Sequence, residues 1–172
     1  MKEKINWQGQ EYEMQWFDST DFSKLDNIIQ VYGFLFDKNN KICIVRPTEE
    51  RGWRLPGGKI EKGEDWQKAI IREADEEADV GIDKNSLIPI GYIKVIPLSK
   101  NSKEKIHYLL RVVGKITKIN EQTEDIAEGL INERIFINPK DFLDYCPWGK
   151  IGEIQRDKAI GVFEECERCE KI

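Results

Sequence analysis

Apolar and polar residues alternate along the N-terminal stretch of the chain. The alternation surrounds Gly9, and its apolar positions are Ile5, Trp7, Tyr12, Met14 and Trp16. Because successive side chains of a strand point to opposite faces, this spacing predicts a small β-hairpin. We therefore expect residues 1–27 to form an N-terminal appendage and residues 28–172 to form the main domain.

Continuous apolar runs replace this alternation in the next part of the chain. Residues 28–36 and 42–45 are rich in β-branched and aromatic side chains, and the polar residues 37–40 separate them. This pattern predicts a hairpin of two buried strands. Shorter runs predict further strands over residues 53–55, 90–96, 107–116 and 134–137. The first of these should end at Pro56, Gly57 and Gly58.

Apolar residues recur at helical spacing over residues 65–78. They would form one face of a helix, which consists of Ile70, Ile71, Ala74 and Ala78. A short helix is expected near residues 139–145 and a longer one over residues 151–169. Strands and helices are interspersed without a regular βα repeat. This order predicts an α/β sandwich with a mixed β-sheet.

Composition and charge restrict the function classes. The 172 residues are 40% hydrophobic and 34% charged, which suits one compact domain, and the net charge of -5 argues against an extended nucleic-acid surface. No apolar run reaches the roughly 18 residues of a membrane span, and the N-terminus lacks the apolar core of a signal peptide. We expect a cytoplasmic protein that does not contact the membrane. The pair Cys166 and Cys169 should be reduced thiols on or near a C-terminal helix, because a structural zinc site would have to recruit Cys146 or His107 from far away in the sequence.

The acidic edge of the helix over residues 65–78 is the first candidate site. At about 100° per residue, Glu73, Glu76 and Glu77 fall within an arc of about 100°. Like charges at this spacing destabilise a helix by a few tenths of a kcal/mol per pair. A solvated helix face is the common explanation for such a cluster. A divalent cation is the other, because Mg²⁺ prefers oxygen ligands such as carboxylates.

The residues that precede the helix are better explained by a bound cation than by a solvated helix face. Gly57 and Gly58 lack side chains, so a backbone carbonyl of this loop can approach an ion bound at the acidic edge. Arg72 lies on the helix and Glu64 near its start, and an ion pair between them would tie the loop to the helix. A solvated face explains neither the glycines nor this pair.

From Gly58 to Val80 the sequence resembles the Nudix box of the Nudix hydrolases. That pattern is Gly, five residues, Glu, seven residues, Arg-Glu, an aliphatic residue, any residue, Glu-Glu, any residue, Gly and an aliphatic residue. The positions in register are Gly58, Glu64, Arg72, Glu73, Glu76 and Glu77. Two positions depart from it: Asp79 replaces the usual glycine, and Ala74 is small for its aliphatic position. We expect Asp79 to alter the end of the helix slightly, because Asp tolerates the left-handed conformation.

The resemblance implies a Nudix-type α/β/α sandwich that hydrolyses a pyrophosphate bond with Mg²⁺ or Mn²⁺. The substrate class is a nucleoside diphosphate linked to another group. The catalytic and metal-binding carboxylates would be Glu73, Glu76 and Glu77, with Gly57 and Gly58 adding a backbone oxygen and Glu64 and Arg72 supporting the site. A base or extra ligand outside the box remains open among Glu104, Glu121, Glu124, Glu128 and Glu133. We favour residues 121–128, which follow a long predicted strand.

Alternatives remain at this level. A Nudix-like domain can bind a nucleotide metabolite as a sensor without turning it over, although a sensor need not keep the full acidic set. The sequence does not identify the particular nucleotide, because the box would bind only the diphosphate that all candidate nucleotides have in common. Trp53 and Trp148 can stack a base, although tryptophan more often belongs to a core. The aromatic hairpin can support a homodimer by edge pairing.

Overall fold

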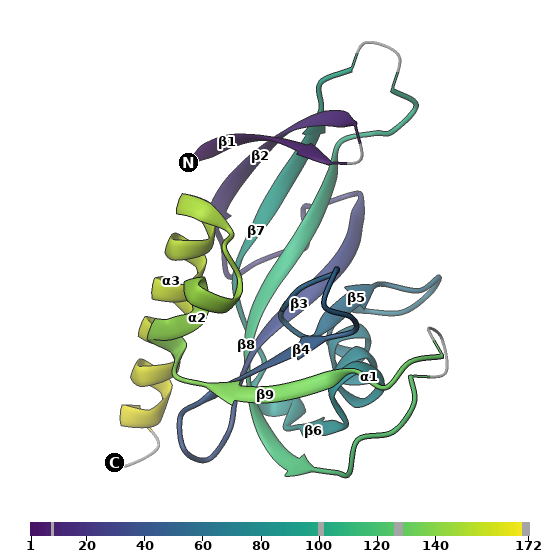
Figure 1. The fold of residues 1–172 in the computed structure, drawn as a ribbon. Coiled ribbons are helices and arrows are strands. Elements are labelled where there is room, and N and C mark those ends of the chain that lie inside the picture. The colour runs from purple at the N-terminus through teal and green to yellow at the C-terminus, as the bar shows by residue number, and fades with distance from the viewer. Residues whose placement is uncertain (8, 100–101, 126–128, 170–172) are drawn as a thin grey trace.

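The computed structural model describes residues 1–7, 9–99, 102–125 and 129–169. Within these ranges one mixed sheet (Figure 1) contains β1 (Lys2–Trp7), β2 (Gln10–Asp18), β3 (Ile28–Phe36), β4 (Ile42–Arg46), β5 (Gly57–Lys59), β6 (Val80–Ile82), β7 (Ile88–Pro97), β8 (His107–Ile119) and β9 (Glu133–Ile137). The order is β1-β2-β7-β8-β3-β4-β9, with β5 paired to β3 and β6 to β8. β3 and β8 run parallel, which makes the sheet mixed.

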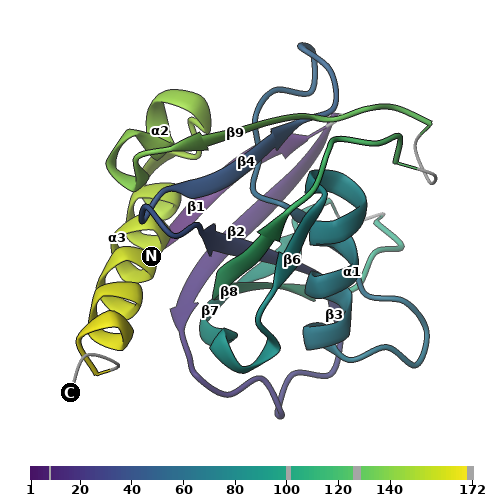
Figure 2. The same cartoon turned by 90° about the horizontal axis from the view of Figure 1, so that it is seen from below.

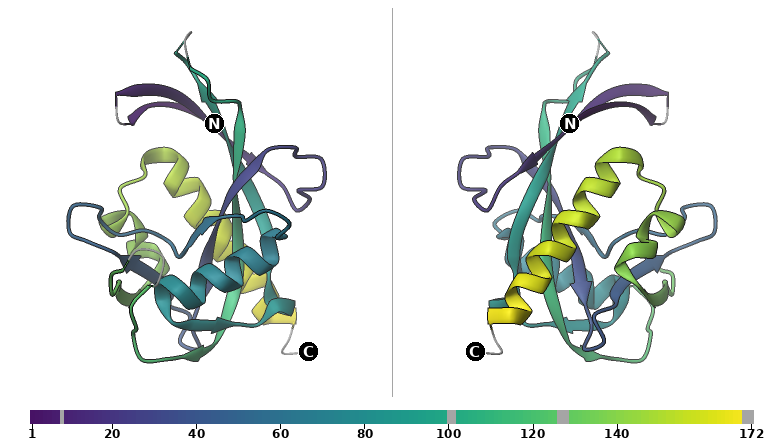
Figure 3. Two further views of the ribbon diagram at one scale, coloured as in Figure 1. Left: turned by 90° about the vertical axis from the view of Figure 1, so that its right-hand side faces the viewer. Right: turned by 90° about the vertical axis from the view of Figure 1, so that its left-hand side faces the viewer.

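Helices cover both faces of this sheet. They are α1 (Trp66–Ala78), α2 (Phe142–Tyr145) and α3 (Gly149–Cys169), with single 3₁₀ turns at Lys84–Ser86 and Pro139–Asp141. α1 contacts β3, β4, β5 and β6, whereas α3 contacts β7 and β8. Figures 2 and 3 show the two long helices on opposite sides of the strands. The predicted α/β sandwich with a mixed sheet is confirmed. No helix in the described ranges is long and apolar enough to cross a bilayer.

The apolar run of β3 contributes side chains to cores on both faces of the sheet. Val31 and Leu35 pack in the cores on the α1 side, and Phe34 and Phe36 pack in the core that includes α3. Successive residues of a strand face opposite ways, so a strand covered on both faces must be apolar at nearly every position. β3 therefore lies between the acidic helix and the opposite layer.

The predicted N-terminal hairpin is confirmed. β1 pairs antiparallel with β2, and β2 pairs in turn with β7, so the hairpin continues the main sheet. Glu3 also connects it to α3, because its carboxylate accepts hydrogen bonds from the backbone of Lys150 at 3.0 Å and Ile151 at 3.3 Å. The division into an appendage of residues 1–27 and a domain of residues 28–172 stays a prediction. So does a homodimer, although β1 does form one edge of the sheet.

The region before α1 differs from the sequence-based expectation. The strand that should end at Pro56 is an isolated bridge between Val45 and Arg54, and Gly57–Lys59 itself forms β5 against β3. Gly57 has a φ of 142°, and a Cβ there would lie 2.2 Å from the carbonyl oxygen of Val31. Only glycine permits so close an approach of the two backbones. The glycines therefore dock the loop on β3.

Asp79 ends α1 in the left-handed conformation, with a φ of 48°. Its backbone therefore takes the conformation for which glycine is usual at this position. Its side chain does more, because it accepts hydrogen bonds from the backbone N–H of Thr123 at 3.0 Å and from the Thr123 hydroxyl at 2.7 Å. The departure from the Nudix pattern thus attaches the segment after β8 to the end of α1.

Replacing Asp79 tests this attachment. Asp79→Ala should lower the free energy of unfolding by about 2 kcal/mol, because it removes both bonds to Thr123 and adds strain to a left-handed residue. Asp79→Asn should lose less, since asparagine keeps an acceptor and tolerates this conformation. Urea unfolding followed by circular dichroism measures both. Asp75→Ala, at an exposed position on α1, is the control, and an equal loss there would contradict the attachment.

Candidate functional site

Arg72 is the centre of the acidic edge of α1. Its Nη1 donates to Glu73 at 2.9 Å and to Glu76 at 2.8 Å, and its Nε and Nη2 donate to the two carboxylate oxygens of Glu64 at 3.1 and 3.0 Å. Its Nη2 also donates to the carbonyl oxygen of Lys59 at 2.9 Å. One guanidinium therefore joins three carboxylates to the loop that follows β5.

The predicted pair of Arg72 with Glu64 is present as a two-pronged contact. Hydrogen bonding by Glu64 is the main cause that raises the pKa of Arg72. In return, the bond from Arg72 lowers the pKa of the Glu64 carboxyl. Glu64 also accepts from the backbone N–H of Glu61 at 3.0 Å. Both groups are therefore held charged, and the loop before α1 is fixed to the helix.

Glu73 is packed against the loop glycines. A Cβ on Gly58 would lie 2.6 to 2.7 Å from the carboxylate atoms of Glu73, so the absent side chain leaves the space that this carboxylate fills. Burial is the main cause that raises the pKa of Glu73 above its usual range, while the contact with Arg72 opposes it. Gly58 and Glu73 therefore share one small volume, and any side chain at Gly58 would displace the carboxylate.

Glu77 lies deeper than the other two glutamates. Its carboxylate pairs with Arg54 and accepts a hydrogen bond from the backbone N–H of Gly57 at 3.0 Å. Burial raises its pKa to about 7 in spite of these two partners. Desolvation of a carboxylate is costly, so the paired charges stay inside only because both donors reach it. Glu77 thus links α1 to the strand bridge and to β5.

A divalent cation was predicted for this edge. Among the described residues, no group of three or more acidic, histidine or cysteine side chains is gathered as a ready ligand set. Glu73 and Glu76 are turned toward Arg72, and Glu77 toward Arg54. The donor set nevertheless fits a hard cation, because Glu73 and Glu76 bring carboxylate oxygens to one guanidinium beside Gly58. Metal ligation by Glu73, Glu76 and Glu77, and by a carbonyl of Gly57 or Gly58, stays a prediction.

The glutamates proposed outside the box are scattered. Glu104 accepts from the Tyr12 hydroxyl at 3.0 Å near the hairpin, and Glu133 pairs with Arg46 at 2.5 Å across β4 and β9. Glu121 and Glu124 are exposed on the segment after β8. Glu128 lies outside the described residues. Among the four of these glutamates that the structure describes, none has a hydrogen bond or ion pair with Glu73.

Asp125 is a site-facing acid that sequence reasoning missed. It is buried, and its charge is among the causes that raise the pKa of Glu73. It belongs to the segment that Asp79 holds through Thr123. Nothing in the sequence distinguishes Asp125 from other loop aspartates. Asp125 comes close to Glu73 only because the segment after β8 is attached to the end of α1.

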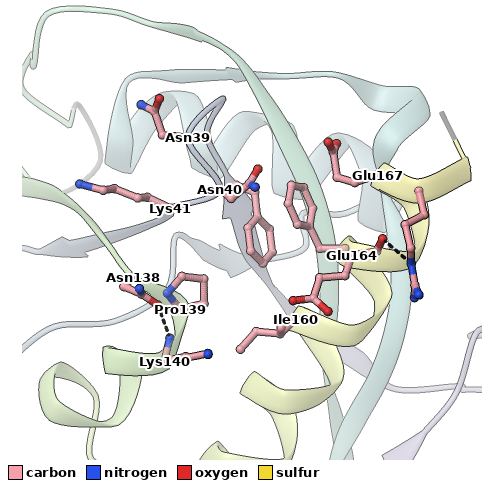
Figure 4. Close-up of a pocket in the computed structure, with 12 residues that line it drawn as sticks. Asn39, Asn40, Lys41, Asn138, Pro139, Lys140, Ile160, Glu164 and Glu167 are labelled. Carbon is pink, nitrogen blue, oxygen red and sulfur yellow. Dashed lines mark hydrogen bonds between the residues drawn. The ribbon is translucent and has the colours of Figure 1, made fainter. Parts of the chain in front are cut away.

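A cavity of about 580 Å³ lies elsewhere, between the turn after β3 and the C-terminal half of α3 (Figure 4). Its lining includes Asn39, Lys41, Lys140 and Glu164, which come from both sides. None of the Nudix-box carboxylates lines it. Volume alone therefore does not identify the functional site of this protein.

Comparisons with known proteins agree with this geometry. A family model described as the NUDIX domain matches residues 26–151, so the protein belongs to the Nudix family. No curated protein sequence matches the chain.

Solved structures share the fold. The pyrophosphohydrolase BsRppH of Bacillus subtilis has a TM-score of 0.69 at 20% identity, over 92% of this chain and 94% of that chain. A NUDIX hydrolase from Nitrosomonas europaea has a TM-score of 0.58 at 12% identity, over 77% and 88% of the two chains. An Ap4A hydrolase from C. elegans has a TM-score of 0.56 at 14% identity, over 80% and 99%. At these identities the likeness establishes the fold.

The contact between Arg72 and Glu64 can be tested by a double-mutant cycle. Arg72→Ala and Glu64→Ala should each lower the free energy of unfolding, and their effects should be non-additive by about 1 kcal/mol or more, because each removes the same two bonds. Urea unfolding of the two single variants and the double variant measures the coupling. The exposed pair of Lys150 and Glu153 is the control, with an expected coupling below about 0.5 kcal/mol. Additive losses at Arg72 and Glu64 would show that the pair does not fix the loop.

Proposed function

We propose that this protein is a Mg²⁺- or Mn²⁺-dependent Nudix hydrolase that cleaves a pyrophosphate bond in a nucleoside diphosphate linked to another group. The observation that carries the proposal is the arrangement of Glu73 and Glu76 around Arg72, beside the open position at Gly58. A purely structural acidic helix needs neither the glycine nor the shared guanidinium. A diphosphate requires neutralisation of its charge before an acidic protein can accept it.

Glu73, Glu76 and Glu77 would hold the divalent cation in this proposal. When bound, such an ion polarises a phosphoryl oxygen and lowers the pKa of water. Gly58 leaves room for the Glu73 carboxylate and for a close approach of the substrate. Glu64 and Arg72 position the loop, and Arg54 and Gly57 hold Glu77 in place. Asp125 joins the candidates for a base or extra ligand, since its charge acts on Glu73.

The compartment and partners follow from the same proposal. The substrate is a small nucleotide rather than a long nucleic acid, in keeping with the net charge of -5. Cys43, Cys146 and Cys169 are free thiols, which suits the reducing cytoplasm. Cys43 and Cys146 are buried, and burial raises the pKa of each to about 12, so these two are inert structural thiols.

Removing the charge of Glu76 tests the hydrolase. Glu76→Gln should lower kcat/KM for Mg²⁺-dependent hydrolysis by about 100-fold or more, since metal ions supply several kcal/mol of charge stabilisation. The assay offers a panel of nucleoside diphosphate derivatives and identifies products by mass spectrometry. Asp75→Asn, on the same helix at an exposed position, is the matched control and should keep its rate. Wild-type rates in folded Glu76→Gln would remove it as an essential ligand. Binding without turnover by the wild type would favour a sensor.

A substitution at Gly58 tests metal binding by Glu73 in a measurement that does not require catalytic turnover. Gly58→Ala should weaken Mn²⁺ binding about tenfold, because its Cβ would push the Glu73 carboxylate aside. Stability should change little, since the group that must move is the end of a flexible side chain. Calorimetric titration with Mn²⁺ and thermal unfolding measure the two effects. Unchanged Mn²⁺ affinity would separate Glu73 from the metal.

A further inference from the structure

Arg111 is a buried charge in the middle of β8, with only 4% of its surface exposed. Its Nε donates to the side-chain oxygen of Gln155 at 2.6 Å, and its Nη1 donates to the carbonyl oxygen of Leu110 at 3.0 Å. Its guanidinium carbon lies 4.9 Å from the centroid of the Tyr32 ring and 5.6 Å from that of Trp148. The cation is therefore held between two aromatic rings by neutral acceptors.

No carboxylate in the described part of the chain pairs with Arg111, and its Nη2 has no hydrogen-bond acceptor there. Burial lowers the pKa of Arg111 to about 10, so it is still protonated at neutral pH. A buried charge without a counter-ion is costly, and replacement by apolar side chains is often neutral or stabilising. The Nη2 of Arg111 is not one of the enclosed polar atoms that lack a partner, so this nitrogen is accessible to an acceptor supplied from outside.

Arg111 lines a cavity of about 460 Å³. The walls are mostly apolar and include Ile5, Met14, Ile93, Trp148 and Ile151. Arg111 is the only basic side chain among the lining residues of this cavity that the structure describes. Such a site has one buried donor, an aromatic wall and little other polarity, which are the features of a pocket for a planar ligand.

Segments outside the Nudix match build two walls of this cavity. The family model covers residues 26–151, whereas Ile5 and Met14 come from the N-terminal hairpin and Gln155 comes from α3. Glu3 closes the hairpin onto the start of α3 through its bonds to Lys150 and Ile151. The cavity is therefore completed by parts of this chain that the family match does not include, while Arg111 and Trp148 belong to the matched region.

Tyr32 connects the cavity with the acidic helix. Its ring lies against Arg111, while its Cα and Cδ1 lie 2.6 and 2.9 Å from the position of a Cβ on Gly57. Gly57 in turn donates to Glu77. The Tyr32 hydroxyl is close enough to Arg111, Glu77 and Glu73 for the charge of each to act on its pKa, so this ring adjoins both the cavity and the carboxylates.

We propose that this cavity holds the base of the nucleotide substrate, and that Arg111 selects a base with two adjacent acceptors, such as the O6 and N7 of guanine. The proposal rests on the hydrolase function above and names the substrate class for that site. The Nη2 of Arg111 and the second N–H of its Nη1 form a fork that can donate to both atoms of this edge, whereas adenine presents an amino donor in place of O6. Trp148 supplies a face on which the base stacks.

A phosphate fits the cavity less well. Phosphate is usually bound by several charged or backbone donors, and Arg111 is the single basic residue among the described lining residues. Glu3 also lines the cavity, and its carboxylate would oppose an anion there. A neutral ring with acceptor atoms meets neither difficulty.

Binding of GMP and AMP in EDTA tests the proposal, because no metal ion is then needed and no turnover occurs. Calorimetry on the full chain should show GMP bound about tenfold more tightly than AMP, as expected for one two-pronged contact with a base. Arg111→Met should remove this preference, and so should Gln155→Glu, which gives Arg111 an internal carboxylate. Circular dichroism confirms the fold of each variant. Arg156→Met on α3, where Arg156 pairs with Asp157, removes the same charge outside the cavity and should keep the preference.

Several results would overturn the base site. These are equal affinity of the wild type for GMP and AMP, no binding of GMP at millimolar concentration, or an unchanged preference in folded Arg111→Met and Gln155→Glu. Loss of the preference in Arg156→Met as well would show a general charge effect and would also overturn it. The hydrolase proposal has a separate readout: GMP preference without Mg²⁺-dependent hydrolysis would reject the hydrolase and keep the base site. Mg²⁺-dependent hydrolysis without a preference for GMP over AMP would reject the base site and keep the hydrolase.

Discussion

The guanidinium of Arg72 is the contact on which the acidic edge depends. Glu73 and Glu76 would repel each other on one face of α1, and Glu64 adds a third negative charge at the start of the helix. Arg72 bonds to all three and to the carbonyl of Lys59, so one cation offsets the repulsion and fixes the loop after β5. Each carboxylate thus has an opposite charge within hydrogen-bond distance, which lowers the cost of placing them close together.

Burial gives the three box glutamates different properties. Glu77 is enclosed, with its charge matched by Arg54 and Gly57, and it belongs to the frame that joins α1 to β5. Glu73 is half-buried against Gly58, and Glu76 is the most exposed of the three. Side chains nearer to solvent can turn toward a ligand with less loss of packing. Glu73 and Glu76 can therefore change their contacts more easily than Glu77, which burial and two donors hold in place.

Two kinds of chemistry meet near Tyr32. On the α1 side lie the carboxylates, the glycine loop and the buried Asp125, which suit charged phosphates and cations. Toward the hairpin and α3 lies a mostly apolar cavity whose single described cation is Arg111. Tyr32 on β3 touches both regions through Gly57 and Arg111. The nucleotide substrate proposed above has two parts with the same contrast, a charged diphosphate and a planar base.

Local patterns in the sequence were enough to predict the strands of β3, β7 and β8, the three helices, the N-terminal hairpin and the pair of Arg72 with Glu64. Each depends on residues close in sequence, whose period or helical spacing sets the geometry. β5 and β6 are short and exist only because β3 and β8 lie beside them, so no local period marked them. The partner of Glu77, the approach of Asp125 to Glu73 and the cavity around Arg111 join residues far apart in the chain. Those contacts were decided by the tertiary structure, because the cost of burying a charge depends on which distant groups enclose it.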